Sequence, residues 1–288
     1  MATLLDLRRR IKSVKNTEQI TKAMKTVSTA KFKKAQRGLF EGRPLWHAAP
    51  DLLARISRWA GARAHPLFAV RAEKTIHVIV ITSDKGLCGA FNSNLLSRTL
   101  EFAEAKSGSC RVRLALAGRK AAHFFKKYPF PVDWAYIGKV DKLGPADIGQ
   151  LARLVTRLYA FMETDGVYIA YNEFKSVLAP RISIAKVLPI VPDPGVPAPP
   201  EAGAPDWEPA GTVLFESLVP RYVEDQISHA FFESRAAEQA ARMMAMDNAS
   251  KNAEELIGGL VLVLNKIRQA EITGELLEIM TAVEALKK

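Results

Sequence analysis

The sequence predicts an α/β fold with long helices: two terminal helices form an antiparallel coiled coil, and a Rossmann-like α/β domain is inserted between them. Near the N-terminus, Leu7, Ile11 and Val14, and then Ile20, Met24 and Val27, recur at steps of three and four residues, a narrow stripe typical of a coiled coil. The middle of the chain alternates β-branched runs with helical patterns. The last stretch is helical again over roughly 75 residues, about 110 Å, too long for a compact domain to bury.

These patterns divide the chain into four parts. Residues 1–60 form the N-terminal helix, 75–188 the α/β domain, 189–211 a linker or insertion, and 212–288 the C-terminal helix. Pro44 and Pro50 leave open whether the first helix is kinked or broken near its end. The linker holds eight prolines, so we expect an exposed, extended segment there.

The inserted domain is predicted element by element. Buried strands are indicated by apolar, β-branched runs, and helices by apolar residues at helical spacing. The expected strands are Thr75–Thr82, Val112–Ala117, Asp133–Ile137, Val167–Phe174 and Arg181–Leu188, and the expected helices are Cys88–Lys106, Gly118–Tyr128 and Gly144–Thr164. The alternation favours a partly parallel sheet, and the short turn before the last strand favours one hairpin.

Three apolar stripes follow one another along the C-terminal helix. They are Val223, Ile227 and Phe231; then Ile257, Leu260 or Val261, Leu264 and Ile267; and finally Ile272, Leu276, Ile279 and Val283. Between the first two lies an alanine-rich stretch that would let two helices approach closely. Because the inserted domain joins both long helices at one end, we expect the pair to be antiparallel, with both chain termini at the other end.

The charge of the chain is concentrated in its first 43 residues. They carry twelve Lys or Arg and three acidic residues, +9 of the total formal charge of +11. A solvated helical face would explain such a run, and so would contact with an acidic partner. Two cysteines exclude a disulfide scaffold, and we expect both Cys88 and Cys110 to be buried thiols.

The sequence lacks the common motifs of enzyme active sites. No GxxxxGK[ST] loop is present, the five histidines are scattered, and no GxSxG turn occurs, so we expect no catalytic residue, cofactor or metal ion. Asp84-Lys85-Gly86-Leu87-Cys88-Gly89 is the nearest approach to a glycine-rich phosphate loop. Its spacing differs from GxGxxG, which favours a tight strand-to-helix turn over a nucleotide site.

Several motifs, spread from end to end, resemble the γ subunit of F-type ATP synthase. They are Asn16–Met24 (NTEQITKAM), Thr82–Gly89 (TSDKGLCG), Glu238–Met243 (EQAARM) and Asn265–Thr273 (NKIRQAEIT) followed by Glu275-Leu276. The resemblance covers nearly the whole chain. The Pro-rich segment departs from it, and we interpret that segment as a peripheral insertion.

The resemblance implies a non-catalytic rotor shaft. Its partners would be the alpha and beta subunits, which form the catalytic ring, the epsilon subunit and the c-ring, with no nucleic acid. Contacts with the ring would involve Lys22, Met24, Lys25, Arg242, Arg268, Gln269, Thr273 and Glu275. Asp84, Lys85, Gly86 and Cys88 would lie in the foot, towards epsilon or the c-ring. The expected location is peripheral, on the cytoplasmic face of the bacterial inner membrane, or on the matrix side of the mitochondrial one.

Two other classes of protein remain to be weighed. A nucleic-acid-binding coiled coil would use the basic helix for phosphates, and it predicts salt-sensitive binding to DNA. An α/β enzyme with dimerising helical arms would need a polar constellation at the strand ends. The first leaves the motifs of the C-terminal helix unexplained, and for the second no such constellation is evident in the sequence.

Overall fold

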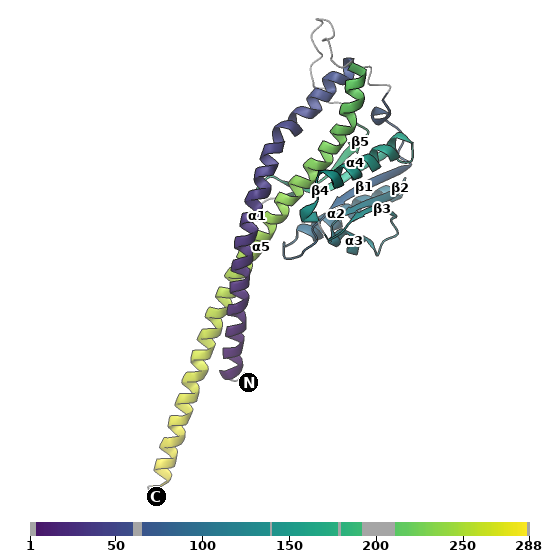
Figure 1. Cartoon of the computed structure of the whole chain (residues 1–288). Helices are drawn as coiled ribbons and strands as arrows, with labels where there is room; N and C mark the ends of the chain where they lie inside the picture. Colours follow the sequence, from purple (N-terminus) through teal and green to yellow (C-terminus); the bar gives the residue numbers. More distant parts are fainter. Residues whose placement is uncertain (1–3, 60–64, 139, 178–179, 192–210, 287–288) are drawn as a thin grey trace. The chain divides into compact units, whose positions relative to one another are not determined.

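The computed structural model describes residues 4–59, 65–138, 140–177, 180–191 and 211–286. The chain divides into two compact units, Met1–Ser28 with Met243–Lys288, and Thr29–Arg242. Its two long helices are α1 (Leu4–Trp59) and α5 (Gly211–Ala285) (Figure 1). Each of them belongs to both units. Pro44 and Pro50 lie inside α1, so the helix continues through both prolines. Most of the predicted Pro-rich segment, 192–210, lies outside the described residues.

The larger unit is built on a five-stranded sheet with the order β3-β2-β1-β4-β5. The strands are β1 (Thr75–Ile81), β2 (Arg111–Ala117), β3 (Val132–Tyr136), β4 (Gly166–Phe174) and β5 (Pro180–Leu188). The first four strands are parallel, and β5 pairs antiparallel with β4. The predicted partly parallel sheet and its one hairpin are therefore confirmed.

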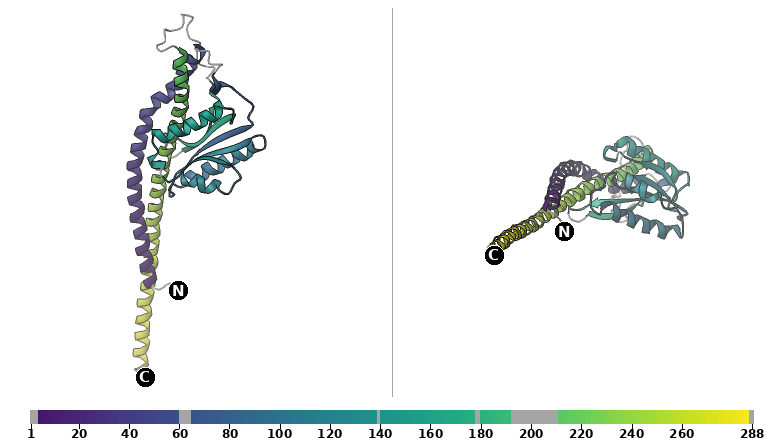
Figure 2. Two further views of the ribbon diagram at one scale, coloured as in Figure 1. Left: turned by 45° about the vertical axis from the view of Figure 1, so that its right-hand side comes forward. Right: turned by 90° about the horizontal axis from the view of Figure 1, so that it is seen from below.

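Helices cover both faces of this sheet (Figure 2). On one face, Ile76, Val78 and Val80 of β1 share a core with α2 (Phe91–Ser107) and α3 (Arg119–Phe125). On the other, Ile79 and Ile81 pack with α4 (Pro145–Ala160) and α5. Two short 3-10 helices, η2 (Pro66–Phe68) and η3 (Val140–Lys142), complete this unit. This is the three-layer, Rossmann-like arrangement that the sequence predicts.

The turn after β2 requires glycine. Gly118 has a φ of 103°, and a Cβ atom there would lie 2.4 Å from the carbonyl oxygen of Thr82. The same threonine binds the next helix, because its Oγ1 accepts a hydrogen bond from the backbone N–H of Ala121. The carboxyl ends of β1 and β2 are thereby held closely together.

The smaller unit is an antiparallel pair formed by the first part of α1 and the last part of α5. Lys25 Nζ lies 2.6 Å from Asp247 Oδ1, and Ser250 Oγ lies 2.7 Å from Thr21 Oγ1. Residue numbers rise along α1 while those of the contacted residues of α5 fall, which confirms the antiparallel prediction. Leu7 and Ile11 are buried in this unit, as their stripe predicts.

The second predicted stripe of α1 is wrong. Ile20 and Val27 are 59% and 57% exposed, whereas Thr21 and Ser28 are buried. The steps of four and three that begin at Leu7, Ile11 and Val14 continue through positions 18, 21, 25 and 28, which carry polar or charged residues. Ile20, Met24 and Val27 each lie one position before a residue of this seam. The predicted stripe is therefore rotated by about 100° around the helix from the true seam.

The predicted stripes of α5 differ in outcome. Val223, Ile227 and Phe231 are buried in the larger unit, as predicted. Ile257, Leu260, Leu264 and Ile267 are partly buried and continue the seam from the buried Ala253. Ile272, Leu276, Ile279 and Val283 are instead 49–60% exposed, because no described residue packs on them. That third stripe is therefore not part of the intramolecular coiled coil.

Candidate functional site

The turn after β1 connects it to α2, which begins at Phe91 and not at Cys88 as predicted. Leu87 and Gly89 have φ angles of 63° and 56°, so the chain passes twice through the left-handed region before the helix starts. For Leu87, which is 61% exposed, this conformation costs energy. The turn therefore displays a leucine side chain to solvent.

Asp84 organises the loops around this turn. Its Oδ1 accepts hydrogen bonds from the backbone N–H groups of Arg119, at 2.9 Å, and Gly138, at 2.8 Å. Its Oδ2 accepts one from Val140 N–H, at 2.8 Å. One carboxylate thus joins the starts of α3 and η3 to the end of β1. Among the predicted foot residues, Asp84 has its acceptors engaged within the chain, and Lys85 is the exposed one.

Cys88 lies inside the turn, 2% exposed. Its sulfur is 3.1 Å from Asn92 Nδ2, and Asn92 in turn bonds Ser83. Burial raises the pKa of the Cys88 thiol, although the charge of Arg242 opposes this. Cys88 and Cys110 are both free and buried, as predicted. A buried thiol with a raised pKa is a poor nucleophile.

Arg242 connects the turn to α5. Its Nη2 bonds Glu238 Oε1 at 2.6 Å, and its Nε and Nη2 lie 3.4 and 3.5 Å from the carbonyl oxygen of Gly86. Its side chain is only 10% exposed. The Arg242 guanidinium therefore contacts the turn after β1 of its own chain. The other residues predicted to contact the ring belong to the smaller unit, whereas Arg242 belongs to the larger one.

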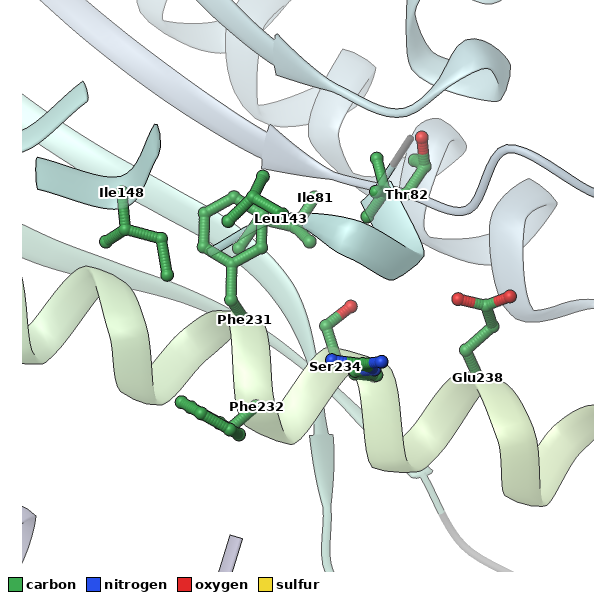
Figure 3. A pocket seen from close by; sticks show the side chains of 10 residues that line it. Ile81, Thr82, Leu143, Ile148, Phe231, Phe232, Ser234 and Glu238 are labelled. Atoms are coloured by element: carbon green, nitrogen blue, oxygen red, sulfur yellow. The ribbon is translucent and has the colours of Figure 1, made fainter. Parts of the chain in front are cut away.

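The carboxyl end of β1 closes against α5 with little room left. Phe231 of α5 points toward Ile81 and Leu143, and Ser234 and Glu238 line the same gap (Figure 3). The cavity there holds about 40 Å³, which suits a water molecule and not a nucleotide. Among the described residues, no group of three or more His, Cys, Asp or Glu side chains is placed to bind a metal ion.

The remaining predicted contact residues lie on the two helices of the smaller unit. Lys22 is exposed and pairs with Glu18 of the preceding turn at 2.5 Å, and this hydrogen bond raises the pKa of Lys22. Met24 and Lys25 are partly buried, and Lys25 pairs with Asp247. On α5 all four predicted residues are exposed: Arg268, Gln269, Thr273 and Glu275. Thr273 Oγ1 bonds its own helix, at the carbonyl oxygen of Gln269.

Two buried or partly buried carboxylates were not predicted from the sequence. Glu73, just before β1, accepts hydrogen bonds from Lys106, Tyr168 and Lys186. Glu233 is 3% exposed on α5, beside the predicted alanine-rich stretch. The sequence signal for Glu233 is limited to an acidic residue placed between Phe232 and the alanines. Its partners come from distant parts of the sequence and leave no local pattern.

The fold and these surfaces define the class of the protein. It is a coiled-coil protein with an inserted α/β domain, in which a long helix closes the carboxyl edge of the sheet. No described helix is both long and apolar enough to cross a bilayer. The family model described as ATP synthase matches residues 3–286, and its curated relatives are gamma chains, so the chain belongs to the ATP synthase gamma chain family.

Relatives agree with this assignment, and solved structures share the fold. The chain is 39% identical to the ATP synthase gamma chain of Pelotomaculum thermopropionicum, covering 100% of both chains. It is 42% identical to that of Anaeromyxobacter sp. strain Fw109-5, again over 100% of both. The fold is shared with a chain in the mitochondrial ATP synthase of Euglena gracilis, with a TM-score of 0.65, 22% identity and coverage of 99% and 96%. A chain of the Tetrahymena thermophila central stalk and c-ring gives 0.63 at 24% identity, with coverage of 80% and 99%. The resemblance stated from the motifs is confirmed.

Proposed function

We propose that this chain is the non-catalytic central shaft of an ATP synthase, which couples rotation of a c-ring to conformational change in a ring of alpha and beta subunits. The observation that carries the proposal is the end of α5. From Arg268 to Ala285 the helix continues without a partner in the described chain, and it exposes Ile272, Leu276, Ile279 and Met280. An isolated helix with so many exposed apolar side chains suits insertion into a partner.

The basic part of α1 supports the same proposal. Lys22 projects from the helix pair, while Lys25 is neutralised by Asp247. Ile20 and Val27 are also exposed, on another flank of α1, about 140–160° around the helix from Lys22. A surface that mixes cations with single apolar residues can follow an acidic, moving partner without one deep binding minimum. We infer that Lys22, Met24 and Lys25 of α1 meet the ring, and that Arg268, Gln269, Thr273 and Glu275 of α5 do so as well.

The foot turn is proposed to face epsilon or the c-ring. Lys85 and Leu87 are its exposed side chains, whereas Asp84, Gly86 and Cys88 shape the turn from within. Catalytic residues and nucleotide sites would lie on the partner subunits. The assembled chain would sit peripherally at a membrane, and its bacterial relatives favour the cytoplasmic face of a bacterial inner membrane.

Reconstitution tests this proposal. The purified chain is mixed with separately prepared alpha and beta subunits, and complex formation and ATP hydrolysis are measured with and without it. We expect one stable complex whose formation depends on this chain. Failure to form a complex at low salt, together with tight binding to plain DNA, would instead support a nucleic-acid-binding protein.

A further inference from the structure

The carboxyl ends of β1 and β4 are the place where an open α/β sheet normally takes a ligand. The chain runs from β1 to β2 and β3 on one side and places β4 and β5 on the other, so the strand order reverses between β1 and β4. Ligands bind at such a switch point in most sheets of this kind. Here α5 lies across it, and its polar side chains Glu233, Glu238 and Arg242 point into the strand ends.

Glu233 holds the last residue of β4. Its Oε2 accepts a hydrogen bond from the backbone N–H of Phe174, at 2.7 Å. Arg43 of α1 donates from Nη2 to the carbonyl oxygen of the same residue, at 3.4 Å, and lies 3.6 Å from Glu233 Oε1. Both backbone groups of Phe174 are therefore bound by side chains of two different long helices. This closed ring of three residues is called the Phe174 clasp below.

Glu233 and Phe174 of the clasp are buried and tightly packed, whereas the Arg43 side chain is 35% exposed. Phe174 is 5% exposed, and its ring lies 5.3 Å from that of Phe32 of α1. Trp46 packs on His229, at 4.6 Å between rings, and His229 Nε2 lies 3.3 Å from Glu233 Oε1. Hydrogen bonds to a charged group are strong in such an environment, and a lost partner is costly.

A second contact lies further along α5. Arg242, oriented by Glu238, reaches the Gly86 carbonyl in the turn after β1. Arg242 follows Glu233 by nine positions, which corresponds to about 14 Å along the helix axis. Two polar contacts at that separation, on neighbouring strands, oppose both tilting and rolling of the helix against the sheet. With a single polar contact, only the apolar packing of α5 on the sheet would oppose pivoting about that contact.

We propose that the Phe174 clasp and the Arg242–Gly86 contact are the torque-bearing joints of the chain, which fix the α/β domain to its two long helices. This inference rests on the proposed shaft function. In this chain, the crevice that other α/β folds use for a ligand serves as a socket for a helix. Glu233, Arg43 and Arg242 act as positioning residues, since none of them meets a substrate.

The test uses the whole ATP synthase reconstituted in vesicles with Glu233→Ala or Glu233→Gln in this chain. ATP hydrolysis and ATP-driven proton pumping are measured on the same vesicles. With Glu233→Ala we expect hydrolysis to persist while the protons pumped per ATP fall several-fold, because the helices slip against the domain under load. Glu233→Gln keeps an oxygen for Phe174 N–H, so it should lie between Glu233→Ala and the native chain.

Controls separate a mechanical role from a merely structural one. Glu216→Ala removes an exposed glutamate from the same helix and should leave the pumping ratio unchanged. Deuterium exchange should rise at Phe174 in Glu233→Ala. An unchanged ratio in Glu233→Ala, or parallel losses of hydrolysis, pumping and thermal stability, would overturn the proposal. If the native chain itself failed to assemble, the shaft function and not the joint would be at fault.

Discussion

At the scale of single residues, Asp84 shows how one side chain can determine the shape of a loop cluster. Its two oxygens bind three backbone N–H groups from two separate segments. We expect Asp84→Ala to lower the free energy of unfolding by about 1–3 kcal/mol, because these amides lose a charged acceptor. Asp84→Asn should cost less, since one oxygen remains.

Urea unfolding of the isolated chain measures this effect. Lys85→Ala is the matched control, because Lys85 is the exposed neighbour in the same turn. Equal stabilities of Asp84→Ala and Lys85→Ala would show that water replaces the carboxylate at no cost.

A substitution at Met24 is expected to affect function without a large effect on stability. It is partly buried beside Lys25, which is paired with Asp247. A lysine at position 24 can extend its charge into water, so Met24→Lys should change the unfolding free energy of the chain by about 1 kcal/mol or less. In the assembled enzyme it would add a cation to the proposed ring contact.

We therefore expect Met24→Lys to reduce coupling more than stability, as measured by proton pumping per ATP in vesicles and by thermal melting. Met24→Leu retains the apolar volume and serves as control. Full pumping by the lysine variant would remove Met24 from the proposed contact.

At the scale of elements, the seam between α1 and α5 contains a polar stretch. The hydroxyls of Thr21 and Ser250 lie 2.7 Å apart and are both buried. We expect Thr21→Val alone to destabilise the chain by about 0.5–1.5 kcal/mol, because it leaves Ser250 with fewer partners. The double change Thr21→Val with Ser250→Ala should recover most of this loss.

A double-mutant cycle of thermal melts measures the coupling between the two hydroxyls, which we expect to be about 1 kcal/mol. Strictly additive single changes would show that the pair contributes nothing jointly.

The same elements show what a sequence can and cannot predict. The buried runs of β1, β4 and the first α5 stripe were predictable because their apolar residues face a core within the chain. Ile20 and Val27 were wrongly predicted to line the seam, since both are exposed while Thr21 and Ser28 are buried there. Glu233 and Arg43 could not be paired in advance, because nothing local links positions 190 residues apart in sequence. The tight turn between β1 and α2 was correctly predicted, but its residues bond groups distant in sequence, which leave no local pattern.

The exposed end of α5 allows a clean separation of folding from assembly. Removal of Gln269–Lys288 takes away a segment whose described side chains, up to residue 286, pack on no described part of the chain. We expect the melting temperature of the isolated chain to stay the same, while reconstituted enzyme loses coupled ATP hydrolysis. A marked drop in melting temperature would show that this segment is needed for the fold itself.

At the scale of the whole molecule, the α/β domain is stabilised at both edges of its sheet by charged groups. At the carboxyl edge these groups join strands to the long helices. At the amino edge, Glu73 joins α2, β4 and β5 through Lys106, Tyr168 and Lys186. The two edges therefore respond to different perturbations. The joints at the carboxyl edge are expected to matter under mechanical load, and Glu73 to matter when the pH falls.

The pH dependence follows from the pKa of Glu73. Burial opposes its ionisation, but hydrogen bonds from Lys106, Lys186 and Tyr168 outweigh burial and hold the pKa at about 2, below the ordinary 4.5. A carboxylate with a lowered pKa in the folded state stabilises the fold above its unfolded pKa, and this stability is lost as the pH falls from about 4.5 to about 2. We expect Glu73→Gln to cost about 2–3 kcal/mol at pH 7. The difference from the native chain should shrink steadily below pH 4.5, in urea unfolding carried out at a series of pH values. Glu104→Gln, an exposed glutamate of α2, should show no such convergence. A gap between Glu73→Gln and the native chain that did not change with pH would mean that Glu73 acts by its shape and not by its charge.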